Sequence, residues 1–323
     1  MATKVVFVAG FGRNGGTLVD RILGEVGGIV SLGEFRFVWK KGVVQNELCN
    51  CGAPFRQCSF WQRVFDRAFG GMDATYAEEV MALYERVDRT RYFPWFLGPL
   101  RPKAFQGRLT EYTGILTRLF RAVATETGAR AIVDSSKFAA YGAVLSRMPG
   151  FKVYILHLVR DSRASAYSWG KCVAKPEVPD RTEVLPRFSL TSSAMQWTYR
   201  NVASGWLRAI NPRYLRIRYE DFATTPRSAT MEILRFVGED PERVPFLNER
   251  TVLLGDSHTQ SGNPSRFAKG PTLIRPDLSW RHQMPPAGRT IVTAMTWPLL
   301  LRYGYRVRVK EIGPRNDTLE TQG

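Results

Sequence analysis

Short runs of apolar residues alternate along the chain with stretches in which apolar positions recur at helical spacing. Runs rich in β-branched and aromatic residues, typical of buried strands, occur at 5–9, 131–133, 153–159 and 214–218. Because helical stretches separate these runs, the pattern predicts a parallel sheet with right-handed crossovers. We therefore expect an α/β fold in which helices flank the sheet and ligands bind beyond the carboxyl ends of the strands.

A different pattern interrupts this alternation between residues 60 and 128. Apolar residues recur there at helical spacing, and an aromatic and proline-rich break lies at 91–102. We interpret 60–128 as a helical substrate cap inserted into a single domain of residues 1–312, followed by a flexible tail at 313–323. Four aromatic residues of the break could line a substrate pocket, although such a cluster is more often core: Tyr92, Phe93, Trp95 and Phe96.

The first predicted strand runs into a glycine-rich turn, Gly10-Phe11-Gly12-Arg13-Asn14-Gly15-Gly16-Thr17. Apolar residues at 18, 19, 22 and 23 follow at helical spacing. Glycines let backbone N–H groups close around an anion, and a helix start adds further N–H groups. The order of strand, glycine turn and helix therefore predicts a loop that binds phosphate.

Two known phosphate-binding templates fit this turn. Read from Gly10, it is the Walker A pattern with Gly16 in place of the lysine, which argues against ordinary ATP or GTP hydrolysis. The one cation of the loop is Arg13, whose planar guanidinium can bind two phosphate or sulfate oxygens at once.

The turn also matches the pattern G-x-G-x-x-G, with Glu34 at the position where a dinucleotide-binding fold would hold the ribose. An NAD(P)-binding Rossmann oxidoreductase is thus an alternative, although it would not need Arg13. A turn that serves only chain geometry is a third interpretation.

A second strand also ends in a polar helix start. The run 153–159 is followed by Arg160, and Ser168 lies eight residues further on. Eight residues are about two helical turns, so both side chains can face one additional phosphate. The two strand ends together describe a nucleotide that carries charge at two places.

With these two segments, the chain resembles the sulfotransferases that use 3′-phosphoadenosine-5′-phosphosulfate (PAPS), and looks closest to bacterial members with a Cys-x-Cys-Gly segment. Further segments that carry the resemblance are 134–137, 218–221 and 262–267. It implies a P-loop-like parallel sheet and PAPS as the sulfuryl donor. The donor-binding residues that it implies are Gly12, Arg13, Asn14, Gly15, Gly16, Thr17, Arg160, Ser168 and Arg266. Two positions depart from the family pattern: Asn14 stands in place of a serine, and Gly16 in place of a hydroxyl residue.

Sulfuryl transfer needs a base for the acceptor and a cation for the leaving phosphate, and it demands no metal. We expect Arg13 and Lys137 to stabilise the developing charge. Glu34 follows a short apolar run that would emerge beside the glycine loop, so we expect it to be the base. His157 and His258 are rival bases, although His157 lies in an apolar strand where a core role is more common.

The net charge of +17 and the pI near 10.1 suit anionic ligands of several classes. We find no lysine or arginine run, zinc finger or aromatic RNA-binding motif, so we expect no nucleic-acid partner. A noncatalytic anion-binding or nucleic-acid-binding protein stays an alternative. The expected acceptor is a hydroxyl, or an amine, of a small molecule, glycan or lipid. The sequence leaves both the acceptor and the oligomeric state open.

The sequence contains no run of about 18 uncharged apolar residues, and its N-terminus enters the first strand directly. We therefore expect a cytoplasmic protein without a transmembrane segment. Reduced cysteines suit that compartment. Three of the four cysteines, Cys49, Cys51 and Cys58, lie close together in the sequence. They are buried thiols, a local disulfide, or zinc ligands completed by Cys172 or His157.

Overall fold

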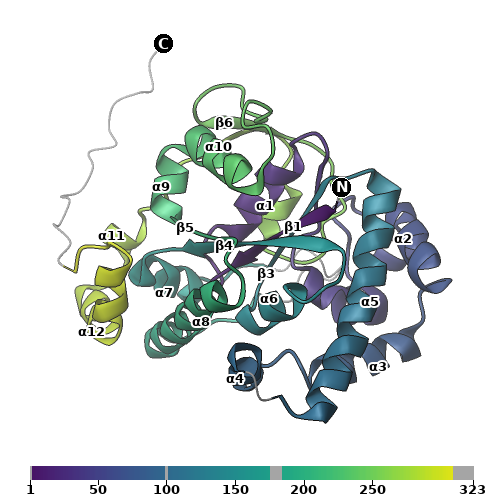
Figure 1. Cartoon of the computed structure of the whole chain (residues 1–323). Helices are drawn as coiled ribbons and strands as arrows, with labels where there is room; N and C mark the ends of the chain where they lie inside the picture. The colour runs from purple at the N-terminus through teal and green to yellow at the C-terminus, as the bar shows by residue number, and fades with distance from the viewer. Residues whose placement is uncertain (1, 99–100, 175–183, 308–323) are drawn as a thin grey trace.

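A five-stranded parallel sheet forms the centre of the molecule (Figure 1). Its strand order is β2-β3-β1-β4-β5. The computed structural model describes residues 2–98, 101–174 and 184–307. The four strands expected from the apolar runs are confirmed. The strands are β1 (Thr3–Ala9), β2 (Ile29–Ser31), β3 (Ala131–Lys137), β4 (Phe151–Val159) and β5 (Tyr214–Arg218), and a separate antiparallel pair consists of β6 (Thr251–Leu254) and β7 (Gly270–Leu273).

The central strand β1 explains the continuous apolar pattern at the N-terminus. Its residues from Val5 to Ala9 are at most 1% exposed, because both sides of the strand carry neighbours and both faces carry helices. Val5 and Phe7 join the core formed with α5 (Lys103–Thr127), α6 (Ala139–Leu145) and α8 (Leu190–Ile210). Val6 and Val8 join the core formed with α1 (Gly16–Gly24), α9 (Tyr219–Thr224) and α10 (Pro226–Val237). The sheet is therefore buried on both faces.

Helices on the two faces of the sheet account for most of the chain between the strands (Figure 1). The α/β fold class is confirmed. The helices are α1 (Gly16–Gly24), α2 (Ser59–Phe69), α3 (Ala74–Tyr84), α4 (Phe93–Leu97), α5 (Lys103–Thr127), α6 (Ala139–Leu145), α7 (Ser162–Gly170), α8 (Leu190–Ile210), α9 (Tyr219–Thr224), α10 (Pro226–Val237), α11 (Trp280–Gln283) and α12 (Pro286–Arg302).

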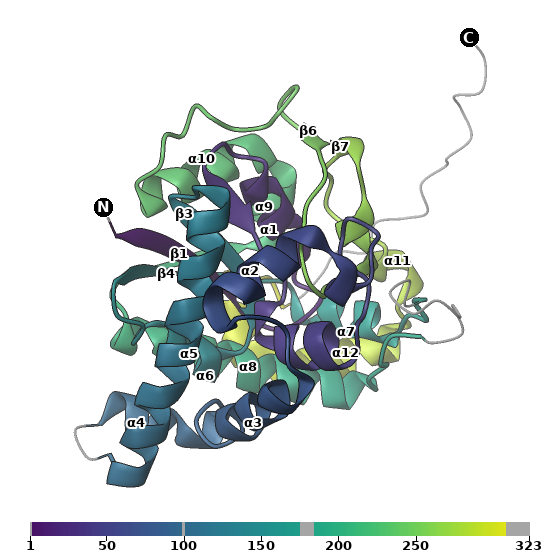
Figure 2. The same ribbon diagram turned by 90° about the vertical axis from the view of Figure 1, so that its right-hand side faces the viewer.

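The predicted helical region at 60–128 contains α2 to α5, which lie together on one side of the molecule (Figure 2). Their apolar faces belong to the same core as one face of the sheet. Phe35, for example, stacks on Trp61 at 5.5 Å between ring centroids and meets Phe120 edge-on at 5.3 Å. The helices thus extend the core of the domain.

The sheet order disagrees with the dinucleotide-binding alternative. In a Rossmann fold the first two strands are neighbours, whereas here β3 lies between β1 and β2. Glu34, which follows β2, is therefore one strand further from the glycine turn than a ribose-binding carboxylate would be.

The described helices include none that is long and apolar enough to cross a bilayer. The expected tail at 313–323 lies outside the described residues.

Candidate active site

A cavity of about 610 Å³ opens where β1, β3 and β4 end. Its walls come from the glycine turn, from the residues that follow β2, β3 and β4, from α7 and α8, and from the segment 262–275. Ten of the residues singled out in the sequence lie on these walls: Gly12, Arg13, Asn14, Gly15, Gly16, Thr17, Glu34, Lys137, Arg160 and Ser168. The fold thus brings segments that are far apart in the sequence to one place.

The glycines of the turn are required by close neighbours. A Cβ atom on Gly12 would lie 2.6 Å from the ring of Trp169, and one on Gly15 would lie 2.5 Å from the ring of Tyr219. Gly15 is also the N-cap of α1 with a φ of 87°, a conformation that favours glycine. The loop is therefore packed tightly against Trp169 and Tyr219, which line the cavity together with it.

Asn14 fastens the loop to β4. Its side-chain nitrogen donates to the carbonyl of Leu158 at 2.7 Å, and its side-chain oxygen accepts from the backbone N–H of Gly16 at 3.0 Å. Asparagine makes these two contacts with two different side-chain atoms, a donor and an acceptor, whereas serine would have a single hydroxyl oxygen for both. Thr17 is also engaged, since its hydroxyl accepts from the backbone N–H of Asn263 at 3.3 Å.

Arg13 is held over an aromatic ring. Its guanidinium carbon lies 5.2 Å from the centroid of a Trp169 ring, and the indole N–H of Trp169 donates to the carbonyl of Gly12 at 3.1 Å. Arg13 has a φ of 64°, which costs free energy in any residue other than glycine. Burial lowers the pKa of the Arg13 guanidinium, while the nearby Glu34 raises it.

Lys137 and Glu34 form an ion pair beside the loop. The lysine Nζ lies 2.5 Å from Oε1 of Glu34 and donates to the carbonyl of Ser135 at 2.9 Å. A Cβ atom on Gly16 would lie 3.1 Å from the Cε of Lys137. A lysine from the end of β3 therefore lies in the space into which the side chain of a Walker lysine would project from position 16. Lys137, like Arg13, has a positive φ, of 70°.

Glu34 stays ionised at neutral pH. Burial raises the pKa of its carboxyl, but the charge and hydrogen bond of Lys137, with a contribution from Lys41, outweigh burial and lower the pKa below its usual value. The backbone N–H of Glu34 donates to the carbonyl of Gln260 at 2.9 Å, which fixes the residue against a distant segment. The carboxylate is thus ready to accept a proton.

The two rival histidines are away from the cavity. His157 is completely buried, and its ring nitrogens contact the hydroxyl of Tyr214 at 2.5 Å and the side-chain oxygen of Asn201 at 2.9 Å. Burial lowers the pKa of His157 to about 4. The ring of His258 faces the cysteine cluster. Neither is among the described residues that line the cavity.

Arg160 and Ser168 both reach the cavity, the latter from α7. The guanidinium of Arg160 donates to the backbone carbonyl of Arg13 at 3.0 Å and pairs with Asp277 at 3.0 Å. Its central carbon lies 4.6 Å from the centroid of the Tyr219 ring. Arg160 therefore connects the glycine loop with Asp277, which lies just after the lining segment 262–275.

Arg266 is not brought to the lining. Its side chain is 1% exposed, and its two terminal nitrogens each donate at 2.8 Å, one to the carbonyl of Thr259 and the other to that of Leu48. Arg266 therefore ties its own loop to the segment after Glu47. The aromatic residues of 91–102 are also elsewhere, since Tyr92, Trp95 and Phe96 pack on Phe105 of α5. No described residue of 60–128 lines the cavity.

Sequence reasoning missed several cations of the cavity wall. Lys41, Arg200 and Arg275 line it in addition to those expected. Arg200 lies four residues after Gln196 on α8, a spacing that puts both side chains on one helix face, and both line the cavity. Among the described lining residues, six are lysine or arginine and one is acidic, namely Glu34. The cavity is strongly electropositive and suits a multiply charged anion.

Comparisons with known proteins agree with this geometry. A model described as "Sulfotransferase family" matches residues 5–242. The sulfotransferase domain of the Synechococcus PCC 7002 olefin synthase is 19% identical, with a TM-score of 0.52 over 95% of this chain and 97% of that one. The sulfotransferase domain from the curacin biosynthetic pathway is 15% identical, with a TM-score of 0.52 over 95% and 99%. These likenesses show the fold. No curated protein matched the chain.

Proposed function

Because the chain belongs to the sulfotransferase family, we propose that it transfers a sulfuryl group from PAPS to a hydroxyl group, or an amine, of a small-molecule, glycan or lipid acceptor. The observation that carries this proposal is the ratio of charges around the cavity. Six cationic side chains surround a single carboxylate, Glu34, among the described lining residues. A donor with several negative charges needs the cations, and an acceptor that must lose a proton needs the carboxylate.

The cavity has room and partners for such a donor. Its volume of about 610 Å³ lies within the range of about 300–1,000 Å³ that is usual for small-molecule sites. The loop 10–17 and the start of α1 would hold the 5′-phosphosulfate, since helix N-termini bind anions. Arg160 and Ser168 would hold the 3′-phosphate. We assign Arg266 a supporting role, because its guanidinium is bound to backbone carbonyls.

The donor supplies an activated sulfuryl group whose leaving group is a phosphate. Glu34 takes the proton of the acceptor as the acceptor oxygen attacks sulfur in line. The bond between sulfur and the phosphate oxygen breaks, and its electron pair stays on that oxygen. Lys137 and Arg13 neutralise this negative charge. Because both cations are already in position before the reaction, they lower the activation free energy of the transfer. Phe37 and Phe138 line the cavity as well and give the acceptor an apolar surface.

Binding of adenosine 3′,5′-bisphosphate, the spent donor, tests the nucleotide assignment without an acceptor. At 100 times its Kd the bisphosphate should stabilise the protein by about 2.7 kcal/mol, which is several degrees in a thermal-shift assay. AMP, which lacks the 3′-phosphate, should bind more weakly. Arg160→Ala should remove the preference for the bisphosphate over AMP.

Arg218→Ala is the matched control for this test. Arg218 ends the neighbouring strand β5 and pairs with Asp221 at 2.6 Å, and it is not among the described lining residues. Its loss should leave the preference unchanged. A thermal shift with NAD but none with the bisphosphate would refute the proposal.

Transfer of labelled sulfate from PAPS to a panel of hydroxyl and amine acceptors tests the reaction itself. A noncatalytic anion-binding protein would transfer none to any acceptor. Tight, salt-sensitive binding of RNA without transfer would favour the nucleic-acid alternative instead. We also propose that the protein works in the cytoplasm, where its free cysteines would stay reduced.

A further inference from the structure

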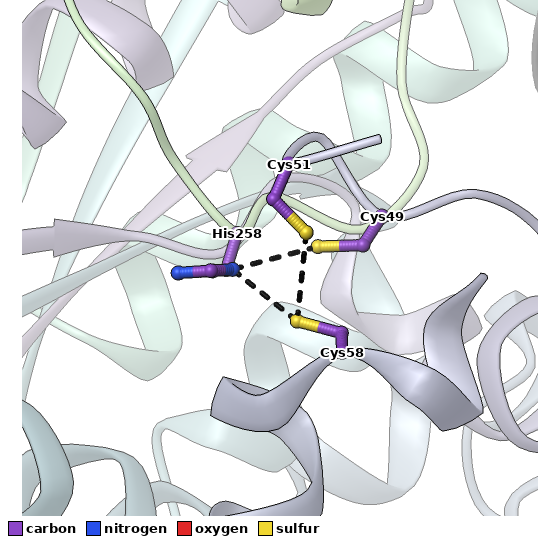
Figure 3. A group of neighbouring side chains, drawn as sticks. All are labelled: Cys49, Cys51, Cys58 and His258. Atoms are coloured by element: carbon purple, nitrogen blue, oxygen red, sulfur yellow. Dashed lines mark hydrogen bonds between the residues drawn. The ribbon is translucent and has the colours of Figure 1, made fainter. Parts of the chain in front are cut away.

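Four potential metal ligands converge on one point outside the cavity (Figure 3). Cys49, Cys51 and Cys58 come from one loop and the start of α2, whereas His258 comes from a segment 200 residues further along the chain. Their ligand atoms all lie within 4.8 Å of one another. None of the four is among the described residues that line the cavity.

Three of the six separations between the ligand atoms match a single tetrahedral ion, and the others are no longer than 4.8 Å. With Zn–S bonds of about 2.3 Å and a Zn–N bond of about 2.0 Å, a tetrahedron has S···S edges of about 3.8 Å and S···N edges of about 3.5 Å. The sulfurs of Cys51 and Cys58 are 3.7 Å apart, and Nδ1 of His258 lies 3.3 Å from the sulfur of Cys58 and 3.7 Å from that of Cys49. A disulfide would need about 2.05 Å.

From this geometry we infer that Cys49, Cys51, Cys58 and His258 bind one Zn²⁺. Three thiolates and one imidazole in a tetrahedron are a usual set for structural zinc. The ligand set differs from the sequence-based alternative, because the fourth ligand is neither Cys172 nor His157. His157 is bonded to Tyr214 and Asn201 inside the sheet.

The surrounding residues hold the imidazole in place. The ring of Phe60 stacks on the ring of His258 with 4.7 Å between centroids, and the indole N–H of Trp61 donates to the His258 carbonyl at 3.0 Å. These two contacts orient Nδ1 towards the sulfurs. The site is therefore built into the fold, since the aromatic residues two and three positions after Cys58 hold the ligand from the distant segment.

The zinc ion has a structural role, because all four tetrahedral positions are taken by protein ligands. It fastens the loop that carries Cys49 and Cys51 to the segment that contains His258, Thr259 and Gln260. The carbonyl of Gln260 accepts the backbone N–H of Glu34 at 2.9 Å. Zinc thus braces the segment against which Glu34 is held, and this role does not depend on the identity of the reaction.

Metal analysis of the purified full-length protein tests the inference directly. Protein purified without added metal or chelator should contain about one equivalent of zinc by elemental mass spectrometry. Cys172→Ser is the matched control and should retain the zinc, whereas Cys58→Ser and His258→Ala should lose most of it. Wild-type protein that lacks zinc, or that contains iron in its place, would overturn the assignment.

Thiol reactivity of the wild-type protein gives a second test that does not depend on the folding of a variant. Cys51 and Cys172 are both exposed. A coordinated Cys51 should react with iodoacetamide far more slowly than Cys172, and a strong chelator should remove this protection. Peptide mass spectrometry reads each cysteine separately. If Cys51 reacts as fast as Cys172 before chelation, the zinc site does not exist.

Discussion

Removing the charge of Lys137 should reverse the effect of Glu34 on stability. In the wild type the folded pKa of Glu34 is lowered. The ionised carboxylate therefore adds stability above the unfolded pKa of about 4.3, and this contribution is lost as pH falls through the folded pKa. In Lys137→Met the burial of Glu34 remains without its main partner. We expect its folded pKa to rise above the unfolded value, so that the carboxylate costs stability at pH 7.

The magnitude follows from the burial of the pair. Breaking a buried ion pair by removing one partner costs about 3–5 kcal/mol. The side chains of Lys137 and Glu34 are 9% and 21% exposed, so solvent reduces the cost, and we expect about 2–3 kcal/mol at pH 7. Glu34→Gln should destabilise the wild type but stabilise the Lys137→Met protein. The coupling free energy of the double-mutant cycle should be about 2 kcal/mol.

Urea unfolding followed by tryptophan fluorescence measures all four proteins, since the chain contains eight tryptophans. As pH falls from 7 to 4, the stabilisation of Lys137→Met by Glu34→Gln should shrink, because the carboxyl becomes protonated. The exposed pair of Arg218 and Asp221 is the control cycle, with an expected coupling of about 0.5 kcal/mol or less. A similarly small coupling between Lys137 and Glu34, or one independent of pH, would refute the reasoning.

Three further predictions concern single residues. Glu34→Gln should lower the turnover of sulfate transfer by about 10²-fold or more with bisphosphate binding intact, and near-normal turnover would exclude Glu34 as the base. Gly15→Ala should lower the free energy of unfolding measured in urea by about 1–3 kcal/mol and weaken bisphosphate binding, because the φ of Gly15 is positive and an added Cβ would meet Tyr219. The control Gly107→Ala, on α5 where the Cβ would meet nothing, should not lower the stability of the protein. Burial raises the folded pKa of Asp20 to about 7, so protonation of Asp20 should add stability to the wild type as pH falls from 8 to 5. In the same assay Asp20→Asn should reduce this gain in the free energy of unfolding by on the order of 3 kcal/mol.

The parts of the site that follow one another in the chain could be predicted from the sequence. The glycine turn between β1 and α1 is local, and so is the spacing that brings Arg160 and Ser168 to one cavity. Both depend on a strand that ends and a helix that begins within a few residues. Patterns of apolar residues are sufficient for such elements.

Contacts between distant segments could not be predicted. Arg266 carries the right charge for a donor contact, but its guanidinium is bound by carbonyls at positions 48 and 259. The sequence grouped Cys49, Cys51 and Cys58 and offered Cys172 or His157 as the fourth ligand, whereas the fourth member of the cluster is His258, from a distant segment that is hydrogen-bonded to the backbone of Glu34. Neither arrangement leaves a local signal.

The pairing of Glu34 with Lys137 shows how register turns two strand ends into one site. β2 pairs with β3 in parallel, with Ser31 opposite Val133, and the ladder continues as the N–H of Ser135 donates to the carbonyl of Gly33 at 2.8 Å. Glu34 and Lys137 therefore emerge at the same level of the sheet. In a Walker loop the lysine comes from the helix start, whereas here Gly16 leaves that space to a lysine from β3. The cation is thereby placed against the proposed base, which suits a reaction that must take a proton and stabilise a leaving phosphate at neighbouring points.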